Sequence, residues 1–171
     1  MTYPRELREY EDLIPLDFEY RALPGEHVDV CCMVSYGLRS GRRWRLWRDQ
    51  LTFPPFPIDR NHLFVAYNFA AELSCFLALG WPLPPITSIL DLRTAFLNHT
   101  NGHVLPDGVG LLGAMSYFGL NSISVVEKQE MRDLAMRGGP FTEQERKDLL
   151  DYCETDVVAL VKLLGKMYGQ V

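Results

Sequence analysis

The sequence predicts a single α/β domain over residues 1–171, in which strands come first and helices follow. The early segments show the two-residue alternation of strands, and the later segments show apolar side chains at helical spacing. No internal repeat, low-complexity tract or linker divides the chain. A length of 171 residues also suffices for one domain with a sizeable core.

The first predicted strand covers residues 13–20, where apolar and acidic side chains alternate. One face carries Leu16, Phe18 and Tyr20, and the other carries Asp17 and Glu19. Proline lacks the N–H that a strand ladder uses, so we expect Pro15 at the beginning of this strand rather than in its middle.

Two further segments predict a hairpin. Residues 28–36 alternate as a second strand, and residues 42–47 form a third, with the turn-forming residues 37–41 between them. The prolines in residues 49–61 predict an exposed loop without regular structure. Residues 62–66 then predict a short buried strand.

Helical spacing first appears over residues 68–79, and Gly80 ends this segment. A further strand is predicted over residues 86–92, and helices are predicted over residues 111–118 and 125–136. Thr142 and Glu145 have the spacing of a capping box, which predicts the start of a long final helix with an apolar stripe.

The composition is that of an ordinary globular protein, with 47% hydrophobic and 23% charged residues. No apolar run approaches the ~20 residues of a membrane span, and the polar N-terminal segment does not resemble a secretory signal. We therefore expect a cytoplasmic protein without a membrane partner, whose four cysteines are reduced and hold no zinc. The net charge of −5 argues against nucleic-acid binding by bulk charge, but not against local basic patches and metal ions.

Two carboxylates lie on one face of the first strand. Asp17 and Glu19 are close enough to repel each other unless a cation or a proton lies between them. Hard divalent cations such as Mg²⁺ prefer carboxylate oxygens on a rigid support. An Asp-x-Glu on a strand therefore suits the floor of a metal site, although two acids on a solvent-exposed strand face give the same pattern.

Two more pairs of polar residues have the i, i+4 spacing of one helical face. Asn68 and Glu72 begin the first predicted helix, where the alternative is that Asn68 caps the helix and Glu72 faces solvent. Tyr152 and Asp156 lie on the final helix beside its apolar stripe, where a pair at the edge of the core is the alternative.

Taken in order, the three motifs resemble those of the DEDD (DnaQ-like) 3′–5′ exonucleases, and tyrosine before the last aspartate is similar to the DEDDy branch. The motifs cover almost the whole chain. The resemblance implies a ribonuclease H-like mixed sheet flanked by helices, with strands 1–3 antiparallel. Residues 110–119, 128–132 and 149–153 look similar to the proofreading exonuclease domains of A-family DNA polymerases, especially phage-type ones.

The resemblance also implies roles for individual residues. Two divalent metal ions, Mg²⁺ or Mn²⁺, would be held by Asp17, Glu19 and Asp156, with Glu72 in the place of the usual Asp. Tyr152 would orient the attacking water. Positions near the substrate correspond to Asn68 and to Leu23, an apolar wedge against the terminal bases. Lys128 and Arg132, themselves at i and i+4, are further candidates for contact with the DNA backbone.

The activity implied by the resemblance is 3′–5′ hydrolysis of DNA at single-stranded or frayed 3′ ends, which releases nucleoside monophosphates for proofreading or DNA processing. The cell would be bacterial or phage-infected, and a DNA polymerase is a possible partner because no polymerase domain is expected after Val171. An exoribonuclease on the same scaffold is one alternative. A catalytically silent nucleic-acid-binding or polymerase-docking module is another.

Two other groups of residues are weaker candidates. The arginines around Trp44 and Trp47 suit phosphate contact and base stacking, although the charged outer face of a twisted hairpin is the simpler explanation. His99 and His103 lie in a predicted loop without a third ligand of suitable spacing, so we expect no metal site there.

Overall fold

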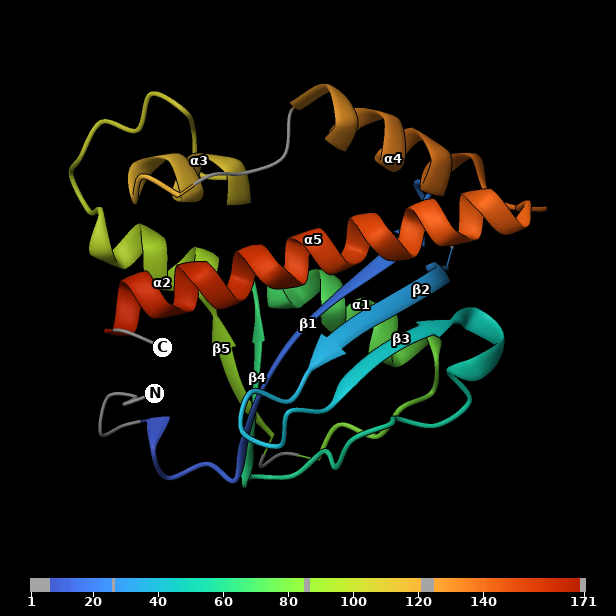
Figure 1. Cartoon of the computed structure of the whole chain (residues 1–171), viewed down its shortest axis with the longest axis horizontal. Helices are drawn as coiled ribbons and strands as arrows, with labels where there is room; N and C mark the ends of the chain where they lie inside the picture. The colour runs from blue at the N-terminus through green and yellow to red at the C-terminus, as the bar shows by residue number, and fades with distance from the viewer. Residues whose placement is uncertain (1–6, 26, 85–86, 121–124, 170–171) are drawn as a thin grey trace.

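A five-stranded mixed sheet forms the centre of the molecule, with helices on both faces (Figure 1). The computed structural model describes residues 7–25, 27–84, 87–120 and 125–169, with the backbone alone for 125–127. The strand order is β3-β2-β1-β4-β5. The strands are β1 (Asp12–Arg21), β2 (Asp29–Tyr36), β3 (Arg43–Trp47), β4 (His62–Ala66) and β5 (Ser88–Asp91).

The pairing confirms the predicted mixed sheet. β2 pairs antiparallel with both β1 and β3. β4 pairs parallel with both β1 and β5. A β-bulge interrupts the β1–β2 register beside Glu19, which pairs with Cys32 while Tyr20 pairs with Val30. Bulges of this kind re-aim side chains and are frequent next to active sites.

The helices lie in two layers. In Figure 1, α5 crosses the front of the sheet and α1 lies behind it. The elements are η2 (Arg48–Gln50), α1 (Phe69–Ala78), α2 (Leu92–His99), α3 (Leu111–Tyr117), α4 (Val125–Arg137) and α5 (Glu143–Tyr168). None of the helices in the described part has the length and apolar character that crossing a bilayer requires.

Three local expectations were wrong. The segment predicted as a strand over residues 86–92 is β5 only over Ser88–Asp91, and α2 was not predicted at all; residue 86 lies outside the described residues. Pro15 lies inside β1, at the point where the pairing with β4 ends and before the pairing with β2 begins. A single turn of 3₁₀ helix, η2, overlaps the start of the predicted proline-rich loop.

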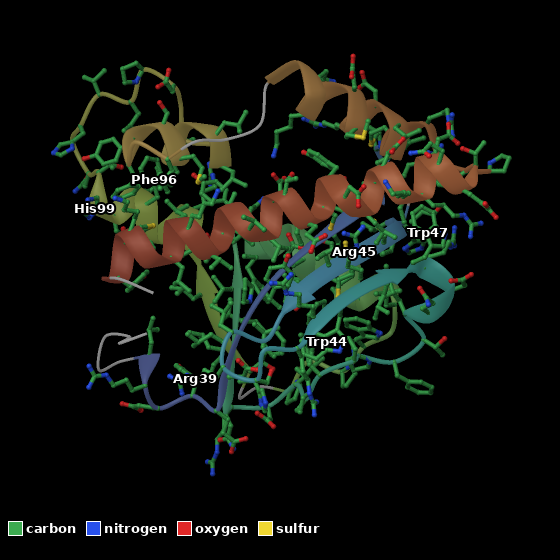
Figure 2. The ribbon with its side chains drawn as sticks, viewed as in Figure 1. Arg39, Trp44, Arg45, Trp47, Phe96 and His99 are labelled. Atoms are coloured by element: carbon green, nitrogen blue, oxygen red, sulfur yellow. The ribbon has the colours of Figure 1, made fainter. Side chains whose placement is uncertain are left out.

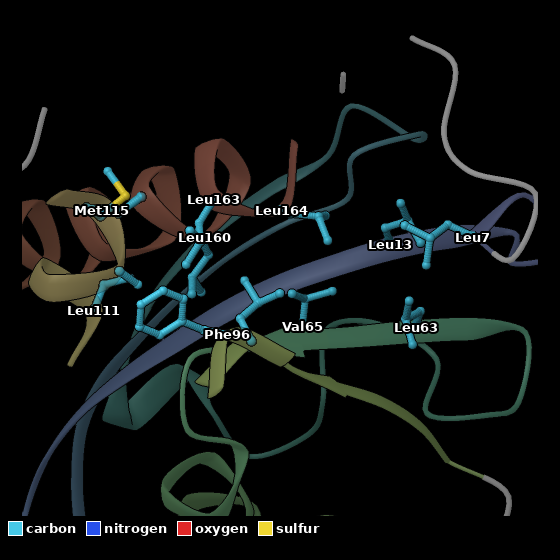
Figure 3. Packing of buried hydrophobic residues seen from close by; sticks show 13 residues of the cluster. Leu7, Leu13, Leu63, Val65, Phe96, Leu111, Met115, Leu160, Leu163 and Leu164 are labelled. Atoms are coloured by element: carbon cyan, nitrogen blue, oxygen red, sulfur yellow. The ribbon is translucent and has the colours of Figure 1, made fainter. Parts of the chain in front are cut away.

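Alternation along β1 divides its side chains between two cores. On the α1 side, Ile14, Leu16 and Phe18 pack with a group of aromatic rings that includes Phe64, Phe76 and Trp81. On the α5 side, Leu13 packs with Leu63, Val65 and Phe96 and with the apolar stripe of α5 (Figure 3). Asp17 and Glu19 share this second face, so they point toward α5 and not toward open solvent.

The long final helix begins as predicted. Thr142 Oγ1 accepts from the Glu145 N–H (3.2 Å), and the Glu145 carboxylate accepts from the Thr142 N–H (2.7 Å). The buried stripe of α5 includes Leu149, Cys153, Val157 and Leu160. Because this stripe packs on β1 and β2, the neighbouring face of α5 is held directly over the acids of β1.

Candidate active site

The acids of β1 lie where this strand extends beyond its parallel neighbour. The β1–β4 register ends at Pro15 and Val65, and the chain leaves β4 after Ala66. Asp17 and Glu19 therefore lie past the carboxyl end of β4, on the edge of the sheet where open α/β sheets place their ligands. The ligand atoms of Asp17, Glu19 and Cys153 lie within 4.8 Å of one another.

Helix α1 brings Glu72 to these acids. Glu72 is 5% exposed, so the alternative in which it faces solvent is wrong. Asn68 occupies the N-cap position of α1 but makes no capping hydrogen bond through its side chain. Asp91 replaces it: Oδ2 accepts from the Phe69 N–H (2.9 Å) and Oδ1 accepts from the Thr94 N–H (2.8 Å). One carboxylate thus fixes the starts of both α1 and α2.

Helices α5 and α4 supply the remaining wall. Tyr152 and Asp156 are both 8% exposed, and both face the acids of β1. The Lys128 ammonium on α4 donates to Asp156 Oδ2 (2.7 Å) and lies 5.6 Å from the centroid of the Tyr152 ring. A cation of the chain itself therefore contacts the acid cluster.

A cavity of about 690 Å³ joins these groups. Its lining contains eight of the nine predicted site residues: Asp17, Glu19, Asn68, Glu72, Lys128, Arg132, Tyr152 and Asp156. Leu23 is not part of this lining, although its neighbour Ala22 is. The role of Leu23 as a wedge stays a prediction from the resemblance.

Several residues of the site were not predicted as site residues from the sequence. Tyr67, Arg93, Leu111 and Leu112 line the cavity, and Asp91 fixes the helices around it. Arg93 stands at the start of a helix that the apolar pattern did not indicate. An acid directly before a helical segment is the signal that could have identified Asp91 as a cap.

Burial and mutual repulsion raise the pKa values of the acids. Burial, followed by the Asp156 charge, raises the pKa of Asp17 from its ordinary 3.8 to about 8. Burial and then Asp17 raise the pKa of Glu19 and that of Glu72 well above the ordinary range. The cluster therefore holds protons in the absence of a cation, and a bound cation would replace them.

Two neighbours of the acids stay neutral. Burial, and then the Asp156 charge, raise the pKa of Tyr152 far above its ordinary value. Cys153 donates its S–H to the Asp17 carbonyl (3.1 Å) and to Asp17 Oδ2 (3.4 Å), and burial raises the pKa of this thiol. All four cysteines are buried and unbridged.

The arginine-rich hairpin is not part of the cavity. Arg45 forms ion pairs with Asp151 and Glu154 of α5. Trp44 packs edge-to-face on Phe56, and Trp47 packs in the same way on Phe141. Figure 2 shows these side chains around β3, away from Phe96 and His99. The hairpin therefore joins the sheet to α5 and to the connections around it.

The donor set fits a divalent cation. Glu72 accepts from the Phe18 N–H, but its Oε2 is buried and has no hydrogen-bond partner among the described residues. A buried oxygen without a partner is costly unless another group binds it. Four carboxylates on rigid elements are the oxygen ligands that Mg²⁺ and Mn²⁺ prefer.

The raised pKa values have a consequence for stability. Asp17 binds its proton more tightly in the folded state, so the metal-free protein loses stability as the pH rises from about 4 to about 8, by up to ~1.4 kcal/mol per pH unit. In Asp17→Asn this contribution disappears, and the fall in melting temperature over the same range should be smaller. Thermal melts of both proteins in EDTA at several pH values measure this fall. An equal or steeper fall in the variant would contradict the assigned pKa.

The unpartnered oxygen of Glu72 gives a second expectation. A metal at a hundred times its Kd stabilises a folded protein by about 2.7 kcal/mol, which is roughly 5–10 °C for a chain of this size. Glu72→Gln keeps the shape but removes the charged ligand, so the rise in melting temperature on adding Mn²⁺ should shrink. Glu130→Gln, on the exposed face of α4, is the matched control. Equal rises in all three proteins would exclude Glu72 as a ligand.

Comparisons with known proteins place this fold among nucleases. No protein-family model matches the sequence, and no curated protein matches it. A nuclease in its apo form has a TM-score of 0.63 at 16% identity, covering 97% of this chain and 76% of its own. The Nibbler EXO domain of Aedes aegypti has a TM-score of 0.52 at 9% identity, covering 91% of this chain and 78% of that domain.

Escherichia coli RNase D, an exoribonuclease involved in structured RNA processing, has a TM-score of 0.52 at 14% identity. The alignment covers 98% of this chain but 45% of RNase D, so the shared part is less than half of that protein. At these identities the similarity is one of fold. The chain therefore has the mixed-sheet α/β fold that these nucleases share.

Proposed function

We propose that this protein is a metal-dependent 3′–5′ exonuclease that removes nucleotides from single-stranded or frayed DNA ends. The observation that supports this most strongly is the convergence of four carboxylates and one tyrosine, from β1, α1 and α5, in one cavity. Acids without a function rarely stay buried together, because each raises the cost of ionising the others. The nuclease fold agrees with the proposal but does not identify the substrate.

The acids would hold two divalent cations. Asp17, Glu19 and Asp156 would bind one ion, and Glu72 would bind the second together with the substrate phosphate. When bound, such ions supply a hydroxide nucleophile at neutral pH and neutralise the charge that develops on the leaving 3′ oxygen. Lys128 would then give up its contact with Asp156 and contact a phosphate oxygen instead.

Tyr152 would position the attacking water rather than take its proton. A general base must be deprotonated near the working pH, and the raised pKa of Tyr152 keeps its hydroxyl neutral. A neutral hydroxyl both donates and accepts a hydrogen bond, so it can fix the direction of a water molecule. Asp156 lies one turn further along α5, and its carboxylate holds the Tyr152 side chain in position.

The other cavity residues suit one nucleic-acid strand. Arg132 and Arg93 are exposed cations at the cavity wall, and the Asn68 amide lines the same cavity. A cavity of about 690 Å³ has the size that encloses a small ligand such as a nucleotide. Arginine forks bind phosphates in a bidentate manner, which favours a backbone over a free base.

RNA is the second candidate substrate. Escherichia coli RNase D shares the fold and is an exoribonuclease, and two-metal hydrolysis does not itself reject a 2′-hydroxyl. The experiment below therefore compares both nucleic acids. A link to a DNA polymerase, and a role in proofreading, stay proposals that rest on the sequence resemblance.

Digestion of end-labelled oligonucleotides tests the proposed function. With Mg²⁺ or Mn²⁺, a 5′ label should give a descending ladder, and a 3′ label should appear at once as a mononucleotide. EDTA should stop both. Asp17→Asn and Asp156→Asn should be inactive because each removes a ligand of the same ion.

Asp49→Asn, an exposed aspartate on η2, is the control for the loss of one charge. Full activity in EDTA or in Asp17→Asn would contradict the metal assignment. Immediate release of a mononucleotide from the 5′ label, without labelled fragments of intermediate length, would contradict the direction. Faster digestion of RNA than of DNA would select the second candidate.

Tyr152→Phe separates positioning from proton transfer. The variant keeps the ring and loses the hydroxyl, so the rate should fall but stay measurable, and the loss should not exceed the ~10²–10⁴-fold that general acid–base catalysis typically contributes. Its pH–rate profile should keep the shape of the parent profile, because Tyr152 does not titrate in this range. Steady-state rates on a single-stranded oligonucleotide measure both. A variant as active as the parent would remove Tyr152 from the mechanism.

A further inference from the structure

Four rings form an exposed aromatic platform at the ends of α2 and α3, made of His99, His103, Tyr117 and Phe118. The ring centroids of His99 and Phe118 are 5.4 Å apart, those of His99 and Tyr117 are 6.2 Å apart, and those of His103 and Tyr117 are 6.3 Å apart. His103 Nδ1 and the Tyr117 hydroxyl are hydrogen-bonded (3.1 Å). Both histidines and Tyr117 are exposed, and Figure 2 shows His99 at this end of the molecule.

This platform is more ordered than a loop of exposed residues. The sequence predicted a loop around both histidines, but His99 is the last residue of α2. Phe96 fixes the base of the platform, because it is fully buried and packs edge-to-face on Tyr117 (5.5 Å). This packing supports the Tyr117 ring before any ligand binds, which lowers the entropic cost of binding.

The two helices that carry the platform both start at the cavity of the candidate active site. Arg93, the second residue of α2, and Leu111, the first residue of α3, line that cavity. The Tyr67 hydroxyl, also in the lining, donates to the Val109 carbonyl (2.7 Å) just before α3. The Arg93 N–H donates to the Tyr67 carbonyl (3.1 Å). Tyr67 thus ties both helix starts to the cavity wall.

The helices also end together. Six residues separate Arg93 from His99, and six separate Leu111 from Tyr117, which at 1.5 Å per residue is about 9 Å along each helix. Figure 1 shows α2 and α3 running from the centre of the molecule toward the same side. A stacked single strand rises about 3.4 Å per nucleotide, so about three nucleotides span this distance.

We propose that the aromatic platform is a stacking subsite for bases of a single strand whose 3′ end occupies the cavity. This inference rests on the proposed function and names where the upstream nucleotides of its substrate bind. Binding of single strands typically combines cations that follow the backbone with aromatic rings that stack on bases. Here Arg93 is the cavity-lining cation on α2, and the ring of His99 lies at the other end of the same helix.

The chemistry of the rings suits this occupant. The carboxylate beside α3, Asp107, is engaged in a hydrogen bond from Ser116 Oγ (2.6 Å). Imidazole and phenol rings offer flat faces on which bases can stack and edges that can form hydrogen bonds with them. The helices that carry the rings begin at the cavity wall, so a strand that leaves the cavity along them would meet the rings.

Substrate length is the variable that tests the subsite. A dinucleotide fills the cavity alone, whereas an oligothymidylate of twelve or so nucleotides also reaches the platform at about 9 Å. His99→Ala and Tyr117→Ala should each raise KM for the long substrate about tenfold, since a stacked base contributes roughly 1–3 kcal/mol. Neither variant should change kcat, or KM for the dinucleotide.

Tyr117→Phe keeps the ring, so it should restore the parental KM even if Tyr117→Ala is less stable. Phe53→Ala is the matched control, because Phe53 is a 78% exposed ring on the connection between η2 and β4. Equal increases in KM for the long substrate and for the dinucleotide would show a structural role for the platform and overturn the proposal. Unchanged KM for the long substrate in His99→Ala and Tyr117→Ala would overturn it as well.

Binding separates this proposal from the proposed function. If the parent protein hydrolyses neither substrate, the exonuclease assignment fails, and fluorescence anisotropy with a labelled oligothymidylate then tests the platform by itself. About tenfold weaker binding by His99→Ala, but not by Phe53→Ala, supports the subsite. Equal affinities of the parent protein and His99→Ala for the oligothymidylate would overturn it. A parent dimer that dissociates in His99→Ala would show that a second copy covers the platform, which also overturns it.

Discussion

Repulsion among buried carboxylates is the constraint on which the rest of the site depends. Asp17, Glu19, Glu72 and Asp156 lie in one cavity, and only Asp156 is bonded to a cation of the chain, the Lys128 ammonium, among the contacts of the described residues. In the metal-free protein, protons reduce this repulsion, because the acids with raised pKa values keep them. The Lys128 ammonium reduces it further. A divalent cation offsets the repulsion among the carboxylates more completely, so affinity for metal follows from the way the acids are buried.

The fold creates this arrangement through one difference in strand length. Because β1 continues past the end of β4, the acids of β1 pair with β2 on one side but have no strand beside them on the β4 side, where α1 starts. Asp91 at the end of β5 then fixes the starts of α1 and α2. On the other side, the apolar stripe of α5 packs on β1 and β2, which sets Tyr152 and Asp156 over the same point.

Local periodicity explains what the sequence could predict. The two-residue repeat of a strand and the four-residue repeat of a helix put each acid on a face, so the three motifs and most elements were predictable. Contacts between distant segments were not. Lys128 meets Asp156 only because α4 packs on α5, and α2 escaped prediction because its buried apolar residues are only Leu92 and Phe96. Pro15 was misplaced because its position depends on where β1 changes partners.

The central claim is that the buried acids form a metal site, and a crystal soaked in Mn²⁺ tests it most directly. Anomalous scattering locates Mn²⁺ without any assumption about activity. We expect a peak within about 2–2.6 Å of oxygens from Asp17, Glu19 and Asp156, with the Lys128 ammonium moved away from Asp156. A cavity without an anomalous peak at saturating Mn²⁺, with Lys128 still bonded to Asp156, would contradict this account of the site.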